Sequence, residues 1–95
     1  MKKSEYLRHL NQAKKEAIKK FYQEGFEVLC ISDPDWPATL LVISPYNLEK
    51  AKIVRVATFE SNLSEANRKW PSKILPFEIW LRDRKVKDFI LLKFT

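Results

Sequence analysis

The sequence predicts a single α+β domain spanning residues 1–95, with a central mixed sheet flanked by helices and the element order α-β-β-β-α-β-β. Its length of 95 residues suits one domain. Residues 4–24 contain neither Gly nor Pro and repeat apolar side chains at helical spacing. Later segments are rich in β-branched and aromatic residues, which favour strands. One long helix followed by a run of strands, with a second short helix between them, is typical of the α+β and α/β sandwiches.

The first helix is expected over residues 4–24, with one apolar stripe directed at the core. Leu10, Ala17 and Phe21 belong to this stripe. Gly25, the only glycine of the chain, stands where the residue after a helix commonly adopts a positive φ. The helix is therefore expected to end there and the chain to turn back.

The strands are expected where β-branched and aromatic residues alternate or run together between polar segments. The second strand is almost continuously apolar, which favours burial on both faces and a place in the centre of the sheet. The last strand is expected at an edge, where Lys87 and Lys93 would discourage further pairing. A polar connection with one helical turn is expected over residues 45–52. The predicted strands cover residues 26–31, 38–44, 53–59, 77–82 and 86–94, and the second helix covers residues 62–70.

The net charge of +6 is concentrated near the amino terminus. Residues 1–24 hold seven basic and three acidic side chains, a net of +4. At 100° per residue, Arg8, Lys15 and Lys19 fall on the helix face opposite the apolar stripe. Such a face favours contact with a polyanion, and it is equally typical of a solvated surface that keeps a small protein in solution.

Composition excludes several classes of protein. A single Cys excludes an intrachain disulfide and favours a reducing compartment, so a cytoplasmic location is expected. A single His excludes a His-rich metal site, and a single Gly excludes a Gly-rich phosphate loop. No apolar run approaches the length of a membrane span, and the basic start lacks the apolar segment of a secretory signal. We therefore expect no metal, no cofactor and no membrane partner.

The order of the expected elements resembles the core of the PD-(D/E)xK nuclease superfamily, which includes restriction endonucleases and archaeal Holliday junction resolvases. The similarity rests on residues 21–29, then on residues 34–35 or 38–43, and then on residues 53–58. It implies a restriction-endonuclease-like fold. It also implies a metal-binding Asp at the start of the second strand and a (D/E)-x-K motif in the third.

The chain departs from that motif at the positions that carry the chemistry. Arg55 stands where the second acid belongs, and Ala57 stands where the lysine belongs. The place of the second-strand Asp falls on Thr39 or on Asp35, depending on the alignment. The sequence therefore predicts a nuclease-like domain without catalytic residues. The remaining enzymatic hypothesis is a migrated metal site that would require Asp35 and Glu60 to converge.

Arg55 has two interpretations. Its guanidinium suits direct bidentate binding of a phosphate in a site that has lost its metal. Alternatively, it pairs with a local acid, for which Glu60 and Glu78 are the candidates.

Cys30 and His9 are not expected to form a nucleophilic site. Cys30 lies in an apolar run, which predicts a buried and inert thiol. His9 follows Glu5 by four residues and is expected to pair with it. The same spacing predicts a pair between Glu16 and Lys20.

The loop over residues 32–37 contains two Asp and two Pro around a Trp. Asp33 and Asp35 are expected to accept hydrogen bonds from the turn backbone, and Trp36 is expected to pack over the edge of the core. At least two of the three tryptophans, which also include Trp70 and Trp80, are expected to belong to the core rather than to stack on bases.

Three functions remain open. The first is binding of DNA or RNA backbone through the basic helix, with Arg8, Lys15, Lys19 and Arg55 as contacts. The second is a small protein-interaction or homodimeric assembly module that has no nucleic-acid role. The third is a metal-dependent nuclease with the migrated site described above.

Overall fold

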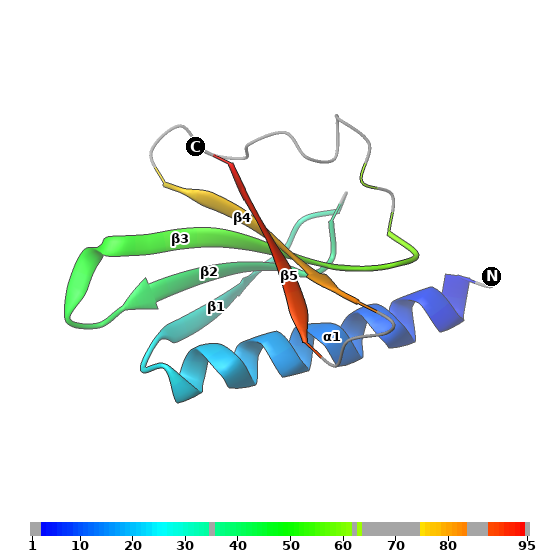
Figure 1. Cartoon of the computed structure of the whole chain (residues 1–95), viewed down its shortest axis with the longest axis horizontal. Coiled ribbons are helices and arrows are strands. Elements are labelled where there is room, and N and C mark those ends of the chain that lie inside the picture. The colour runs from blue at the N-terminus through cyan, green and yellow to red at the C-terminus, as the bar shows by residue number, and fades with distance from the viewer. Residues whose placement is uncertain (1–2, 35, 62, 64–74, 84–87, 95) are drawn as a thin grey trace.

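The computed structural model describes residues 3–34, 36–61, 63, 75–83 and 88–94 (Figure 1). Within these residues one helix packs on a five-stranded mixed sheet, which confirms the α+β class. The elements are α1 (Lys3–Gln23), β1 (Glu27–Ile31), β2 (Thr39–Ser44), β3 (Asn47–Thr58), β4 (Phe77–Arg82) and β5 (Phe89–Phe94).

The strands follow the chain order β1-β2-β3-β4-β5 across the sheet. The pairs β1–β2, β2–β3 and β4–β5 are antiparallel, whereas β3 and β4 are parallel. The register of the parallel pair places Thr58 beside Arg82. The carboxyl ends of β3 and β4 therefore meet at the same edge of the sheet, which is where open sheets with parallel strands tend to bind ligands.

One face of the sheet is covered by α1, which contacts β3 and β1. Leu10, Ala13, Ala17 and Phe21 are buried there, as the apolar stripe predicts. The two alanines let the helix backbone approach the sheet closely, while Leu10 and Phe21 fill the space at either end.

The end of α1 is set by Gly25, whose φ is +88°. Phe26 N donates to the Phe21 carbonyl at 2.9 Å, and Gly25 N donates to the Tyr22 carbonyl at 3.1 Å. These two bonds are the pair that defines a Schellman motif. The expected termination at Gly25 is thereby confirmed.

Alternation along β3 separates two chemical environments. Val54 and Val56 are fully buried on the α1 side, and the Lys52 ammonium lies 5.2 Å from the Phe21 ring centroid on that side. Arg55 points to the opposite face, where its guanidinium lies 5.2 Å from the centroid of the Trp36 ring.

Two expectations about the sheet are wrong. The polar connection expected over residues 45–52 is mostly strand, because the chain turns at Pro45 and Tyr46 and β3 begins at Asn47. Lys50 and Lys52 alternate with the buried residues Ala51 and Ile53, which is the alternation of a strand. The two charged side chains made this stretch look like a polar connection. The central strand is β3 rather than β2, since apolar composition reports burial of both faces and not position in the sheet.

The other strand boundaries agree closely with expectation. The strand over 77–82 is confirmed at both ends, and β1 and β2 each begin one residue later than predicted. The strand expected over residues 86–94 begins at Phe89 and forms an edge of the sheet, as predicted. The helix expected over residues 62–70 lies outside the described residues, apart from residue 63.

In the part of the chain that the structure describes, no helix combines the length and apolar character that a membrane span requires.

Candidate functional site

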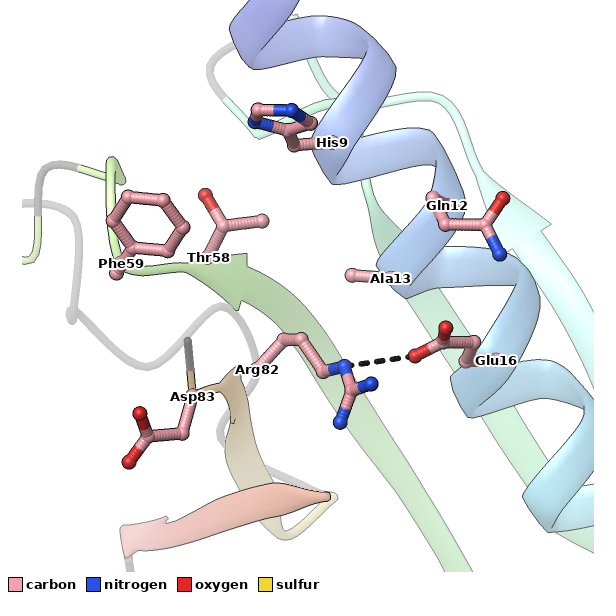
Figure 2. Close-up of a pocket in the computed structure, with 8 residues that line it drawn as sticks. All are labelled: His9, Gln12, Ala13, Glu16, Thr58, Phe59, Arg82 and Asp83. Carbon is pink, nitrogen blue, oxygen red and sulfur yellow. Dashed lines mark ion pairs between the residues drawn. The ribbon is translucent and has the colours of Figure 1, made fainter. Parts of the chain in front are cut away.

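A pocket of about 440 Å³ opens between α1 and the carboxyl ends of β3 and β4 (Figure 2). The helix supplies one wall and the two strand ends supply the other. The walls are built by His9, Gln12 and Glu16 from α1 and by Thr58, Phe59 and Arg82 from the strand ends.

A fixed carboxylate holds His9 at the pocket wall. His9 Nδ1 lies 2.8 Å from Glu60 Oε1, and the Glu60 side chain is only 9 % exposed. Thr58 Oγ1 donates to Glu60 Oε2 at 3.4 Å, and Glu60 N donates to Thr58 Oγ1 at 3.3 Å. The His9 side chain keeps 40 % of its surface exposed, so the imidazole is oriented yet accessible.

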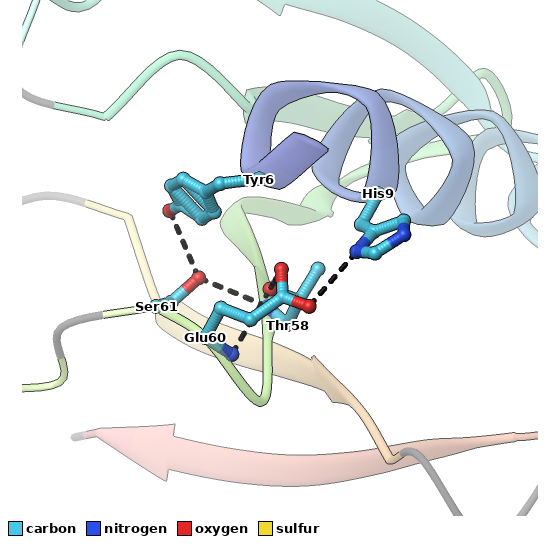
Figure 3. Close-up of polar contacts among 5 residues, drawn as sticks. All are labelled: Tyr6, His9, Thr58, Glu60 and Ser61. Carbon is cyan, nitrogen blue, oxygen red and sulfur yellow. Dashed lines mark hydrogen bonds and ion pairs between the residues drawn. The ribbon is translucent and has the colours of Figure 1, made fainter. Parts of the chain in front are cut away.

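The same network ties the helix to the turn after β3 (Figure 3). Ser61 Oγ accepts from Thr58 N at 3.0 Å and lies 3.0 Å from the Tyr6 hydroxyl. Two side chains of α1, Tyr6 and His9, therefore contact the residues that follow β3. This wall of the pocket is fixed by polar contacts as well as by the apolar core.

The opposite wall is held by Arg82, whose Nε lies 2.8 Å from Glu16 Oε2. The guanidinium also lies 5.7 Å from the Phe89 ring centroid. Arg82 thus contacts both a carboxylate from α1 and an aromatic ring from β5. Its charge is already compensated at the pocket surface.

Another ion pair on this flank of α1 joins Lys20 Nζ to Asp88 Oδ1 at 2.7 Å. The hydrogen bond from Lys20 holds the pKa of the Asp88 carboxyl below its ordinary value, and a further hydrogen bond from Phe89 N acts in the same direction. The pair lies near the surface, where Asp88 is 58 % exposed.

The helix-internal pairs predicted from sequence are wrong. Glu16 binds Arg82 and Lys20 binds Asp88, instead of binding each other. His9 binds Glu60 rather than Glu5. In each case a partner on the sheet side replaces the neighbour one turn along the helix.

The outer face of α1 carries Arg8, Lys15 and Lys19, and all three are exposed, as predicted. Among the residues that the structure describes, none of the three takes part in an ion pair. The helical rise of about 1.5 Å per residue spreads them over roughly 16 Å. This set of three side chains is named the basic face below.

Arg55 does not belong to the basic face. It lies on the sheet face opposite α1, its side chain is 11 % exposed, and its Nη2 lies 3.2 Å from Asp33 Oδ2. Its guanidinium is 5.2 Å from the Trp36 ring centroid and 5.4 Å from that of Phe77. The structure therefore separates Arg55 from the three helix cations with which it was predicted to act.

Asp33 is an acid partner of Arg55 that the sequence did not indicate. Of the two acids that were expected, Glu60 binds His9 and Glu78 binds Lys52 at 3.1 Å. Alternation explains the second case, because Glu78 faces α1 and Arg55 faces away from it.

In the nuclease resemblance, Thr39, Arg55 and Ala57 occupy the positions of the two metal-binding acids and the lysine, and these three residues lie close together in the sheet. Thr39 is the register partner of Arg55, and Ala57 follows two residues along the same strand. Thr39 Oγ1 donates to the Trp36 carbonyl at 2.9 Å and is buried. Within the described ranges, no group of three or more His, Cys, Asp and Glu side chains is placed to hold a metal ion.

The migrated metal site depended on Asp35, which lies outside the described residues. Its second member, Glu60, binds His9 on the α1 side. Arg55 and Glu60 therefore do not converge, since they lie on opposite faces of the sheet.

The loop before β2 matches its predicted structural role at Asp33 and Trp36, whereas Asp35 lies outside the described residues. Trp36 is 5 % exposed and its Nε1 donates to the Val56 carbonyl at 3.0 Å. Asp33 Oδ1 accepts from Trp36 N at 3.2 Å, as expected of an Asp in a turn. Trp80 packs 4.4 Å from the Phe21 ring centroid, so two tryptophans belong to the core, while Trp70 lies outside the described residues.

Cys30 was predicted to be buried, and this is wrong. It is exposed on β1, which forms an edge of the sheet, and its neighbours Leu29 and Ile31 are 56 % and 36 % exposed. The apolar run correctly indicated a strand. It did not reveal that the strand lies at an edge and is covered only in part.

Sequence reasoning missed most of the pocket. The pairing of His9 with Glu60 joins residues 51 positions apart, and no local pattern reports such a contact. One signal was present, because Thr58, Glu60 and Ser61 form a polar group directly after a buried strand. Polar residues at the end of a strand that pairs in parallel are candidates for a binding site.

No protein-family model matches the chain, and no match was found among curated proteins or solved structures.

Proposed function

We propose that this domain binds nucleic acid through the phosphate backbone, with the basic face of α1 as its contact surface. The observation that carries the proposal is a division of charge around one helix. On the flank facing the sheet, Glu16 and Lys20 each form an ion pair, and His9 is hydrogen-bonded to the Glu60 carboxylate. On the outer face, the described ion pairs include neither the arginine nor the two lysines.

Exposed cations without a protein partner are suited to phosphates, because neutralising each phosphate releases a condensed counterion. Three such contacts predict that log K falls with log salt at a slope of about −2.7, at 0.9 per contact for B-DNA. A backbone interaction of this kind adds affinity without reading the sequence.

The proposal includes no cleavage step. The positions at which the resemblance places the two acids and the lysine hold Thr39, Arg55 and Ala57. The guanidinium of Arg55 lies between two aromatic rings and beside Asp33, which supports a structural role. A nuclease-like domain that binds without cutting is consistent with both observations.

A cytoplasmic location forms part of the proposal. Cys30 is a free and exposed thiol, and such thiols persist in a reducing compartment.

Salt titration of duplex binding by fluorescence anisotropy tests the proposal. Lys15→Ala and Lys19→Ala are each expected to reduce the magnitude of the slope by about one. Ser32→Glu is the matched control for either variant, because it also lowers the net charge by one but lies in the loop after β1. Equal effects of Lys19→Ala and Ser32→Glu, or a wild-type affinity that does not change with salt, would contradict the proposal.

A homodimer is the second candidate, and the exposed edge of β1 favours it. Antiparallel pairing of β1 with a second copy, centred on Leu29, would place Val28 opposite Cys30 and keep the Glu27 side chains apart. Size-exclusion chromatography with light scattering tests this directly. A dimer that Leu29→Lys converts to monomer supports the candidate, and a monomeric wild-type protein removes it.

A further inference from the structure

We propose that α1 binds in the major groove of B-form duplex DNA, with the side-chain amides of Asn11 and Gln12 contacting the base edges. This inference rests on the proposed function and deepens it, because it selects DNA over RNA duplexes and adds a preference for sequence to the contacts with phosphates.

The two amides lie between cations of the basic face. Asn11 follows Arg8 by three residues and precedes Lys15 by four, whereas Gln12 follows Arg8 by four and precedes Lys15 by three. Side chains at these spacings are neighbours on the surface of a helix. A ligand whose phosphates contact Arg8 and Lys15 therefore also meets the two amides.

Both amides are available to a ligand. Their side chains are exposed, and in the part of the chain that the structure describes neither takes part in an ion pair or a side-chain hydrogen bond. Figure 2 shows the Gln12 amide turned away from the strand ends. Each amide thus offers both donors and an acceptor to a partner outside the chain.

The helix is placed to enter a groove. It covers one face of the sheet, and none of the described elements lies on its far side (Figure 1). The major groove of B-DNA is about 12 Å wide and admits an α-helix. Arg8 and Lys19 lie about 16 Å apart along the helix axis, so their side chains reach the phosphates on both sides of a groove that the helix crosses. The two amides then face the bases between them.

The chemistry of the amides favours adenine. In the major groove adenine presents the N7 acceptor next to the N6 amino donor. The amino group and the carbonyl oxygen of one Asn or Gln side chain match this pair in a bidentate contact. Two neighbouring amides on one helix face therefore predict a preference for sites that contain adenines.

The same geometry disfavours double-stranded RNA. The major groove of an A-form helix is deep and narrow, so side chains do not reach the base edges there. Base contacts from α1 therefore require B-form DNA, whereas backbone contacts alone accept both kinds of duplex.

The first experiment determines whether the amides select a sequence. Sites that the wild-type protein enriches from a pool of random DNA duplexes are titrated by anisotropy, beside an unrelated duplex. Asn11→Ala and Gln12→Ala are each expected to weaken binding to the enriched site by about fivefold to 150-fold. Binding to the unrelated duplex and the salt slope should not change. Gln23→Ala is the matched control for Gln12→Ala, because Gln23 is also exposed on α1 but lies four residues beyond Lys19.

The second experiment tests the contact on the DNA. Replacing an adenine of the enriched site by 7-deazaadenine removes the N7 acceptor and leaves base pairing and phosphates intact. At a contacted adenine this change should weaken the wild-type protein about as much as the matching amide variant, and it should weaken that variant little further. An RNA duplex of the enriched sequence should bind no more tightly than the unrelated DNA duplex.

The outcomes separate this inference from the function on which it rests. If no sequence is enriched, or if Gln12→Ala and Gln23→Ala bind the enriched site equally, the major-groove contact is overturned. Backbone binding then stands provided that the salt slope still depends on Lys15 and Lys19. Absence of wild-type binding to every duplex overturns both. All three variants should unfold at the wild-type urea concentration within error, because the replaced side chains are exposed.

Discussion

Two polar clusters lie along β3. They contain similar types of residue but differ in how far their side chains are exposed to solvent. The first surrounds Arg55, which contacts Asp33 and lies between the rings of Trp36 and Phe77, with 11 % of its side chain exposed. The second surrounds His9 and the strand ends and opens into the pocket. Each cluster contains an arginine paired with a carboxylate, Arg55 with Asp33 in the first and Arg82 with Glu16 in the second.

The difference shows why residue identity alone misplaces function. In the Arg55 cluster the charge is enclosed by apolar rings, so its interactions contribute to the stability of the fold. In the pocket, side chains with the same chemistry keep accessible surface, so a ligand can contact them. The two clusters should therefore respond differently to substitution.

Trp36→Ala is expected to have the largest effect on stability. The ring is buried, covers Arg55 and donates to the Val56 carbonyl. Truncating a buried Trp typically lowers the free energy of unfolding by about 3–5 kcal/mol. Urea denaturation measures this loss, with Phe59→Ala at the pocket as the comparison. Similar losses for the two variants would show that the clusters do not differ as described.

Asp33→Ala is expected to have an intermediate effect. It removes a carboxylate from a largely buried guanidinium and an acceptor from Trp36 N. Hydrogen bonds to charged groups contribute about 1.5–3 kcal/mol, so a loss in that range is predicted.

A double-mutant cycle with Arg55→Met checks the interpretation of that loss. Once the charge is gone, removal of Asp33 should cost less than it does in the wild-type protein. Strictly additive free energies would show that Arg55 and Asp33 do not interact.

Lys20→Ala is expected to have the smallest effect, because the pair with Asp88 is exposed. The lowered pKa of Asp88 should rise toward its ordinary value when Lys20 is removed. A carboxyl with a lowered pKa stabilises the folded state above its unfolded pKa, and this contribution is lost as the pH falls through the lowered pKa. Carboxyl ¹³C chemical shifts recorded against pH measure the change, and an unmoved midpoint would contradict the role of Lys20.

The sequence was sufficient for those parts of the fold that depend on local pattern. The stripe on α1, the glycine that ends it and the strand over 77–82 follow from spacing and composition. The start of β3 was missed because Lys50 and Lys52 made a strand look like a polar connection. The exposure of Cys30 was missed because an edge strand and a central strand share the same composition.

The candidate site was harder to predict than the fold, since its partners are distant in sequence. The exposure of the basic face followed from helical geometry alone. The partners of His9, Glu16 and Arg55 did not, because each depends on how α1 and the loop before β2 dock against the sheet.

The parallel pairing of β3 with β4 also has a consequence for the order of folding. The first three strands join through short connections, whereas residues 59–76 separate β3 from β4. Closing a longer loop loses more chain entropy, and this loss precedes the contacts that offset it. The strand β4 should therefore dock after the meander of β1, β2 and β3 has formed. The pocket then assembles in the last step, and a ligand held between α1 and Arg82 would slow the release of β4. Amide hydrogen exchange should accordingly slow more in β4 than in β2 when a ligand binds.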